Sequence, residues 1–333
     1  MGVAGPAGCS RRNRLRLNVL NWPTYIDGGA LARFEAETGI GVRQATYESN
    51  EEMLARVMTG NSGWDVVFPS NYFIPPMREM GLLARLDRSR LRNLSYLDER
   101  FQAPGWDGGL EWCAPFVWGG AGILFDGRVR PAPTGWRDLW DGRYRGRMTM
   151  LDDSGEVLGA ALKILGHSLN STSESELRGA YELALRQKPL LRAYLNAEVR
   201  DQVVAGDVLA AQSWATTAQQ AMDAAPHLGF AYPREGFSLY ADCAAVLRES
   251  RRGELAHRFI DYILRPEIAA GLVEKARTAT ANAGARALLG AKAAGLPALY
   301  PDAETLERGE WFAPMPAGAQ RLRDRLWTEL KSA

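Results

Sequence analysis

The alternation of strand and helix patterns is the feature that most constrains how this chain can fold. Leu15, Leu17 and Val19 alternate with polar neighbours, which is typical of a half-buried strand. A loop follows, and residues 30–38 then have a helical pattern that ends at Gly39. This stretch predicts one strand, loop and helix unit.

A second unit follows the first. Ser49 and Glu52 have the spacing of a capping box, so we expect a helix from there to residue 59. Residues 64–68 are typical of a short buried strand, which leads into the loop Pro69-Ser70. Repeated units of this order predict mostly parallel sheets covered by helices, with ligands bound beyond the carboxyl ends of the strands.

A further region begins after the glycine-rich segment 118–122, whose glycines indicate a hinge or close backbone packing. Residues 147–151 are typical of a strand and are followed by Asp152-Asp153-Ser154-Gly155-Glu156. The apolar residues after them share one helical face: Val157, Leu158, Ala161, Leu162 and Leu165. At 333 residues the chain exceeds the usual size of a single core, and we expect two lobes.

Charge excludes two classes of partner. Forty basic and 39 acidic residues leave a net charge of +1, so there is no surplus that would favour nucleic acid or an anionic membrane surface. No apolar run reaches the roughly 18 residues of a membrane span, so we expect the body of the chain to be soluble. Any selectivity for charge must therefore be local.

The cysteines leave two questions open. Residues 7–10, Ala-Gly-Cys-Ser, are similar to the end of a bacterial lipoprotein signal with Cys9 lipidated, and the alternative is a disordered tail over residues 1–14. Cys113 and Cys243 could form a disulfide, although two buried thiols are the simpler interpretation. With no CxxC spacing and three histidines, we expect no metal site.

The sequence lacks the common catalytic motifs. It contains no GxSxG, HExxH, GxxxxGK or GxGxxG motif. Asp152, Asp153 and Glu156 could perform acid/base chemistry, but Asp153 as N-cap and Glu156 as the N3 residue of the next helix explain the same pattern. We therefore expect no enzyme and no cofactor, with a carboxylate-dependent enzyme as the outside alternative.

Aromatic residues stand in polar loops at the ends of several predicted strands. They are Trp22, Tyr25, Tyr72, Trp214 and Tyr240. Each alone is explained by packing. Together with carboxylates they predict a box for flexible organic cations, because rings cover methylenes and attract ammonium groups while carboxylates pair with them.

The chain resembles the spermidine/putrescine-binding proteins of bacterial polyamine ABC transporters. The resemblance runs from about Leu15 to the last helix and is carried by the segments Asn21-Trp22, Ala45-Thr46-Tyr47-Glu48-Ser49-Asn50-Glu51, Pro69-Ser70-Asn71-Tyr72, Ala114-Pro115-Phe116-Val117-Trp118-Gly119, Trp136-Arg137-Asp138-Leu139-Trp140, Tyr232-Pro233-Arg234-Glu235-Gly236, Leu264-Arg265-Pro266-Glu267 and Leu299-Tyr300-Pro301-Asp302. It implies an α/β periplasmic-binding-protein fold, whose two lobes have crossing connections and close on a ligand. We expect residues 15–117 with 241–285 in one lobe, and 118–240 with 286–333 in the other.

The resemblance also implies the ligand-binding residues. By position they are Trp22, Tyr25, Tyr72, Asp153, Glu156, Asn196, Trp214, Tyr240 and Asp242. Three positions depart from the family pattern: Thr24 replaces an acidic residue, Thr278 an aromatic residue and Phe312 a glutamine. The loss of polar groups predicts a putrescine-like diamine in preference to spermidine.

The same resemblance implies an ABC permease and ATPase as partners, a monomer, and a location in the periplasm or attached to the cell envelope. We expect no nucleic acid partner. A binding protein of this fold retuned to another cationic amine or an amino acid-like ligand is the alternative, because a fold does not fix its ligand.

Overall fold

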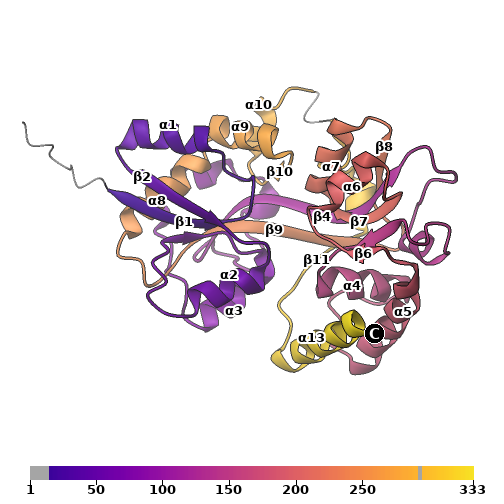
Figure 1. The fold of residues 1–333 in the computed structure, drawn as a ribbon. Coiled ribbons are helices and arrows are strands. Elements are labelled where there is room, and N and C mark those ends of the chain that lie inside the picture. The colour runs from indigo at the N-terminus through magenta and orange to yellow at the C-terminus, as the bar shows by residue number, and fades with distance from the viewer. Residues whose placement is uncertain (1–14, 292–294) are drawn as a thin grey trace, which may run out of the picture.

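Two bodies of strands and helices are joined by two long strands. The computed structural model describes residues 15–291 and 295–333. The joining strands are β4 (Ala114–Asp126) and β9 (Phe237–Val246), which run side by side through both bodies (Figure 1). The predicted lobe boundaries after residues 117 and 240 both fall inside these two strands, and the division into lobes by residue number stays a prediction.

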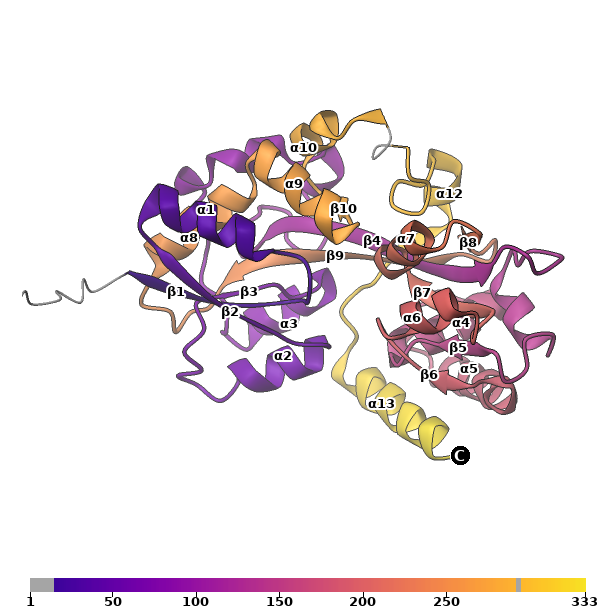
Figure 2. The same cartoon turned by 45° about the horizontal axis from the view of Figure 1, so that its top comes forward.

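The first lobe is the name used here for the body that contains the N-terminal strands. Its elements are β1 (Arg16–Asn21), β2 (Gly41–Thr46), β3 (Val66–Val67), β10 (Ala279–Thr280), α1 (Gly28–Thr38), α2 (Asn50–Val57), α3 (Ile74–Glu79), α8 (Gly253–Ile263), α9 (Pro266–Ala276) and α10 (Ala283–Leu288). Helices α1, α8 and α9 lie on one side of its strands, with α2 and α3 on the other (Figures 1 and 2).

The second lobe is the other body. Its elements are β5 (Met148–Met150), β6 (Ala193–Tyr194), β7 (Ala210–Trp214), β8 (Leu228–Ala231), β11 (Gly309–Trp311), α4 (Ser154–Ile164), α5 (Glu174–Gln187), α6 (Val199–Ala205), α7 (Ala215–Ala224), α12 (Ala303–Glu307) and α13 (Ala317–Ser332). Short 3₁₀ segments occupy Asn71–Phe73, Arg88–Arg90, Arg92–Tyr96, Glu99–Phe101, Trp136–Trp140 and Lys188–Leu190. The C-terminal helix α13 packs against α4 and α5 (Figure 1).

The sheet is mixed, not mostly parallel as the sequence pattern predicts. Its path is β2-β1-β3-β9-β4-β7-β5-β6. β1 is parallel to β2 and β3, and β5 is parallel to β6 and β7, but β9 is antiparallel to β3 and to β4, and β4 is antiparallel to β7. The predicted strand–helix units correspond to the parallel strands at the two ends of the sheet. The antiparallel strands β4 and β9 lie between these ends.

Local sequence signals explain the elements that surround the cleft. Helix α1 ends before Gly39, which adopts the left-handed conformation with φ of 72°, as expected. The Ser49 hydroxyl caps α2 by accepting a hydrogen bond from the Glu52 backbone N–H at 3.1 Å. The Glu52 carboxylate accepts from the Glu48 N–H instead of completing the box, and α2 ends at Val57, two residues before the predicted end.

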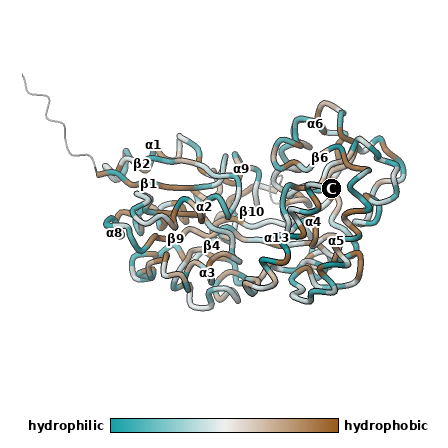
Figure 3. Tube along the Cα trace, turned by 60° about the horizontal axis from the view of Figure 1, so that its bottom comes forward, coloured by the Kyte–Doolittle hydropathy of each residue, from teal (hydrophilic) through white to brown (hydrophobic). Residues whose placement is uncertain are grey.

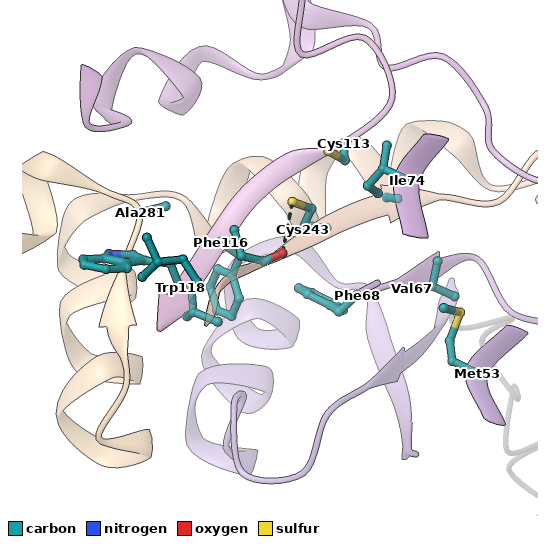
Figure 4. Close-up of a cluster of buried hydrophobic side chains, with 14 of the residues drawn as sticks. Met53, Val67, Phe68, Ile74, Cys113, Phe116, Trp118, Cys243 and Ala281 are labelled. Atoms are coloured by element: carbon teal, nitrogen blue, oxygen red, sulfur yellow. Dashed lines mark hydrogen bonds between the residues drawn. The ribbon is translucent and has the colours of Figure 1, made fainter. Parts of the chain in front are cut away.

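Both lobes bury one face of most helices, so hydrophobic and hydrophilic stretches alternate along the chain (Figure 3). Helix α4 is buried on nearly every side, whereas Leu165, predicted on its apolar face, lies after its end and is exposed. Cys113 and Cys243 are free and buried within the part of the chain that the structure describes, so the second interpretation of these thiols is confirmed (Figure 4). Cys9 lies outside the described residues.

The glycine-rich segment of β4 packs closely against the neighbouring strands β8 and β9. A Cβ atom added to Gly119 would lie 2.6 Å from the Tyr240 hydroxyl, and one added to Gly122 would lie 2.5 Å from the Phe230 ring. Any side chain at Gly119 would therefore displace Tyr240 from β9. Over residues 15–291 and 295–333, the helices include none that is long and apolar enough to span a membrane.

Candidate functional site: an acidic, aromatic cleft

Residues from both lobes line a cleft of about 630 Å³. Eleven of the twelve residues predicted from the sequence lie in its wall: Trp22, Thr24, Tyr25, Tyr72, Asp153, Glu156, Asn196, Trp214, Tyr240, Asp242 and Phe312. They come from loops and element ends that are far apart in the chain, at the carboxyl ends of β1, β3 and β5 and along β7 and β9. Thr278 does not line the cleft. It is 1% exposed, and its hydroxyl has no hydrogen-bond partner among the described residues.

Asp242 forms the carboxylate centre on the side of the first lobe. Its side chain projects from β9, and the residue is 2% exposed. The Tyr25 hydroxyl donates to Oδ2 at 2.8 Å and the Ser70 hydroxyl donates to Oδ1 at 2.7 Å. Burial raises the pKa of Asp242 to about 6, and the two hydrogen bonds oppose this rise. Asp242 is therefore mostly ionised at pH 7.

Glu156 forms a second carboxylate centre, in the first turn of α4. It is 4% exposed, and it accepts hydrogen bonds from the Trp214 indole N–H at 3.1 Å and the Ser238 hydroxyl at 2.7 Å. Burial, followed by the nearby charge of Asp153, raises the pKa of Glu156 to about 8. With these protein groups alone around it, the carboxyl is mostly protonated at pH 7.

Asp153 has a structural role and a position in the cleft at the same time. Its Oδ1 accepts from the Glu156 backbone N–H at 3.0 Å, which confirms it as the N-cap of α4. The predicted capping box is only half formed, because the Glu156 carboxylate turns to Trp214 and Ser238. The cap and the ligand-binding interpretations of this pattern are therefore compatible.

The aromatic walls are held by hydrogen bonds at their polar ends. The Trp22 indole donates to the Phe68 carbonyl at 2.8 Å, and its ring lies 4.6 Å from that of Tyr47. The Tyr72 hydroxyl accepts from Asn50 at 3.1 Å, and its ring lies 5.2 Å from that of Phe312. These contacts leave the ring faces as fixed, preorganised surfaces.

Sequence reasoning missed several residues of the cleft. Ser70 stands at the carboxyl end of β3, in a segment already singled out, and its position after a buried strand was the available signal. Thr216, at the start of α7, is buried beside the Tyr240 phenol. Asp324 and Trp327 come from α13, and no local pattern connects this terminal helix with the cleft.

The cleft carries a strong local negative charge. Among residues 15–291 and 295–333, nine carboxylates and one guanidinium line it. The guanidinium belongs to Arg200, which donates to the Asp201 carboxylate at 2.9 Å and to the side-chain oxygen Oε1 of Gln220 at 3.5 Å. The described residues include no cluster of three or more His, Cys, Asp or Glu suited to a metal ion. The local charge is suited to attracting an organic cation.

Known proteins are similar to this chain in sequence and architecture. The profile of bacterial extracellular solute-binding proteins matches residues 29–299. A spermidine/putrescine-binding periplasmic protein of Escherichia coli is 34% identical over 95% of this chain and 91% of its own, and a putrescine/cadaverine-binding protein of Pseudomonas aeruginosa is 32% identical over 99% and 96%. The structure of a spermidine/putrescine ABC transporter substrate-binding protein from Streptococcus pneumoniae superimposes with a TM-score of 0.84 at 29% identity, covering 96% and 99%.

These relatives settle the class of protein. They are solute-binding proteins, which confirms the predictions of fold class and of a binding protein rather than an enzyme. The coverage extends over both lobes and the cleft, so the similarity is not confined to one part of the fold. The chain belongs to the bacterial extracellular solute-binding protein family.

Proposed function

We propose that this protein is the substrate-binding component of an ABC importer for polyamines, with a putrescine-like diamine as its preferred ligand. The observation that carries the proposal is the pair of buried carboxylates, Asp242 and Glu156, between aromatic rings in a cleft dominated by acidic groups. The same ligand class is supported by the relatives, which are a spermidine/putrescine-binding protein and a putrescine/cadaverine-binding protein.

The proposed binding mode uses one ammonium group for each buried carboxylate. A charge-assisted hydrogen bond contributes about 1.5 to 3 kcal/mol and a cation over an aromatic face about 0.5 to 2 kcal/mol. Several such contacts supply the roughly 8 kcal/mol of micromolar binding after the cost of association. Trp22, Tyr25, Trp214 and Tyr240 would cover the methylene chain between the two ends.

Lobe closure and ligand binding are expected to be coupled. A sequestered carboxylate without a cation is costly, and the raised pKa of Glu156 avoids this cost by keeping the group protonated until a cation binds. An arriving ammonium group supplies the missing charge, which favours the ionised carboxylate and the closed arrangement together.

The preference for a diamine is supported by the groups that this cleft lacks. Thr24 offers a neutral side chain where the family pattern has an acid, and it is exposed with a φ of 65°. Phe312 is buried and presents a ring to Tyr72. A third ammonium group would therefore find fewer partners than the first two.

The proposed partners and location are those of an importer. The solved relative from Streptococcus pneumoniae is described as the substrate-binding protein of an ABC transporter, and the Escherichia coli relative as periplasmic. By the same relationship, this protein would work outside the cytoplasmic membrane as a monomer. It would deliver its ligand to a permease driven by an ATPase.

An amino acid-like ligand is the alternative of a different class. The carboxylate of such a ligand would need a cationic partner in the cleft. Among the described residues, the one guanidinium that lines the cleft is that of Arg200, which already donates to Asp201. No observation on the described residues favours this ligand over a diamine.

Isothermal titration of ligand-stripped protein tests the proposal. The panel is putrescine, cadaverine, spermidine, spermine and agmatine, with arginine and GABA as controls. Micromolar or tighter binding of putrescine, and weaker binding of both controls, is expected. Silence across the amines, or tighter binding of arginine or GABA, would contradict the polyamine assignment. Equal or tighter binding of spermidine would contradict the preference for a diamine alone.

A further inference from the structure

Arg323 places a cation of the protein itself beside the acidic cleft. It is half-buried in α13 and reaches over the first turn of α4. Its Nη1 lies 3.4 Å from the position that a Cβ atom on Gly155 would occupy. The same position is 3.2 Å from Asp153 Oδ1 and 3.4 Å from Phe312 Cε1. The guanidinium therefore shares one small region with the carboxylate of Asp153 and the ring of Phe312.

This guanidinium is incompletely paired. Its Nη2 donates to the Gln320 side-chain oxygen at 2.9 Å, on the same helix. Its Nε is buried and has no acceptor among residues 15–291 and 295–333, where Arg323 forms no ion pair with a carboxylate either. The charge of Arg323 is thus available to act on whatever occupies the neighbouring space.

Two phenols of the cleft show which charged groups lie near each other. Asp242 and Glu156 both act electrostatically on the phenol of Tyr240. Asp153, Glu51, Arg323 and Glu156 all act on the phenol of Tyr72. Arg323 is therefore grouped with Asp153 and Glu51 around Tyr72, and Asp242 is not among the charges that act most strongly there.

We propose that Arg323 is a specificity-determining residue that limits the number of ammonium groups the cleft accepts. This inference rests on the proposed function. A diamine places its two charges at Asp242 and Glu156. The additional ammonium of a triamine extends toward Asp153 and Glu51, where Arg323 already supplies a positive charge and repels it. The arginine side chain thus takes the place of a third ligand cation.

Titration of Arg323→Gln with putrescine and spermidine tests the inference. Removing the charge is expected to tighten spermidine binding about tenfold, equivalent to about 1.4 kcal/mol, and to change putrescine binding by less than about twofold. Arg323→Lys keeps the charge and is expected to retain the wild-type ratio of the two dissociation constants. Arg325→Gln removes the same charge from an exposed position on the same helix and controls for long-range effects.

The decisive quantity is the ratio of the spermidine and putrescine dissociation constants. An unchanged ratio in Arg323→Gln, with both amines still bound, would overturn the role of Arg323 and leave the polyamine assignment intact. The same holds if Arg325→Gln shifts the ratio equally. If the wild-type protein binds none of the amines, the proposed function itself would be overturned. Thermal unfolding of each variant verifies that it is folded.

Discussion

The two buried carboxylates of the cleft differ in how the protein prepares them for a cation. Asp242 receives two hydroxyl donors, from Tyr25 and Ser70, and burial raises its pKa only to about 6. Glu156 receives one hydroxyl and one indole donor, stands beside Asp153, and has a pKa raised to about 8. Asp242 is therefore charged at pH 7 without a ligand, whereas the proposed binding mode requires Glu156 to ionise as the ammonium group binds.

This difference teaches that burial alone does not define a cation site. Both carboxylates accept two hydrogen bonds, but burial raises the pKa of Glu156 further than that of Asp242, and the charge of Asp153 adds to the rise, so Glu156 holds its proton at pH 7 and Asp242 does not. At pH 7, ionising Glu156 costs roughly 1.4 kcal/mol, because its pKa lies about one unit higher. We therefore expect Asp242 to contribute more to net affinity.

The largest expected effect is that of Asp242→Asn. Loss of the charge removes a charge-assisted contact of about 2 to 3 kcal/mol, so putrescine should bind about 30- to 150-fold more weakly. Asp324→Asn removes an exposed carboxylate from the rim of the same cleft and should change affinity by less than about threefold. Titration of both variants measures the contrast, and equal losses would mean that the net field, not Asp242, dominates.

A smaller effect is expected from pH, and it isolates Glu156. Its pKa is raised from 4.5 to about 8 in the empty cleft, so ligand-free stability from this group falls as pH rises through that window. Binding needs the ionised form, so putrescine affinity should rise about tenfold between pH 7 and pH 9, where alkylammonium groups remain mostly charged. Glu156→Gln should flatten this dependence, and an unchanged slope in that variant would assign the proton to another group.

The smallest expected effect concerns contacts between the two lobes, which carry the two carboxylates. Arg277, which follows α9 with a φ of 55°, pairs with Asp223 of α7, and Gln220 donates to the Ala276 carbonyl at 2.8 Å. The pair is half-exposed, so Arg277→Ala should weaken all amines by a similar factor of about two to five.

The matched control for Arg277→Ala lies within one lobe. Arg178 pairs with Glu174 on α5 at 2.8 Å, and Arg178→Ala should leave affinity unchanged. Titration with putrescine and spermidine distinguishes the two variants. A change in only one amine would show that Arg277 acts on the ligand and not on the approach of the lobes.

Local signals predicted one half of the site better than the other. The capping pattern placed Asp153 at the start of α4, because the spacing of an N-cap is written in consecutive residues. The aromatic residues at strand ends, and the family resemblance, pointed to Tyr25 and Asp242. The direction of Glu156 was not predictable, because its donors lie 58 and 82 residues away in sequence.

Long-range arrangement also explains what the pattern did not predict. The strand–helix units indicated parallel pairing, but nothing local marks β4 and β9 as the antiparallel pair that joins the lobes. The position of α13 against α4 depends on tertiary packing, so Arg323 had no signal in sequence. Thr278 was inferred from an equivalent position alone, and its side chain lies in the interior outside the cleft lining.

Calorimetric titration of putrescine at pH 7, in phosphate and in Tris, tests the central claim most directly. These buffers differ in ionisation enthalpy, so the difference between the two observed enthalpies gives the number of protons exchanged on binding. We expect micromolar or tighter binding with release of nearly one proton, because Glu156 would ionise as the ammonium group binds. Tight binding without proton release would contradict the role of Glu156, and absence of binding would contradict the diamine site itself.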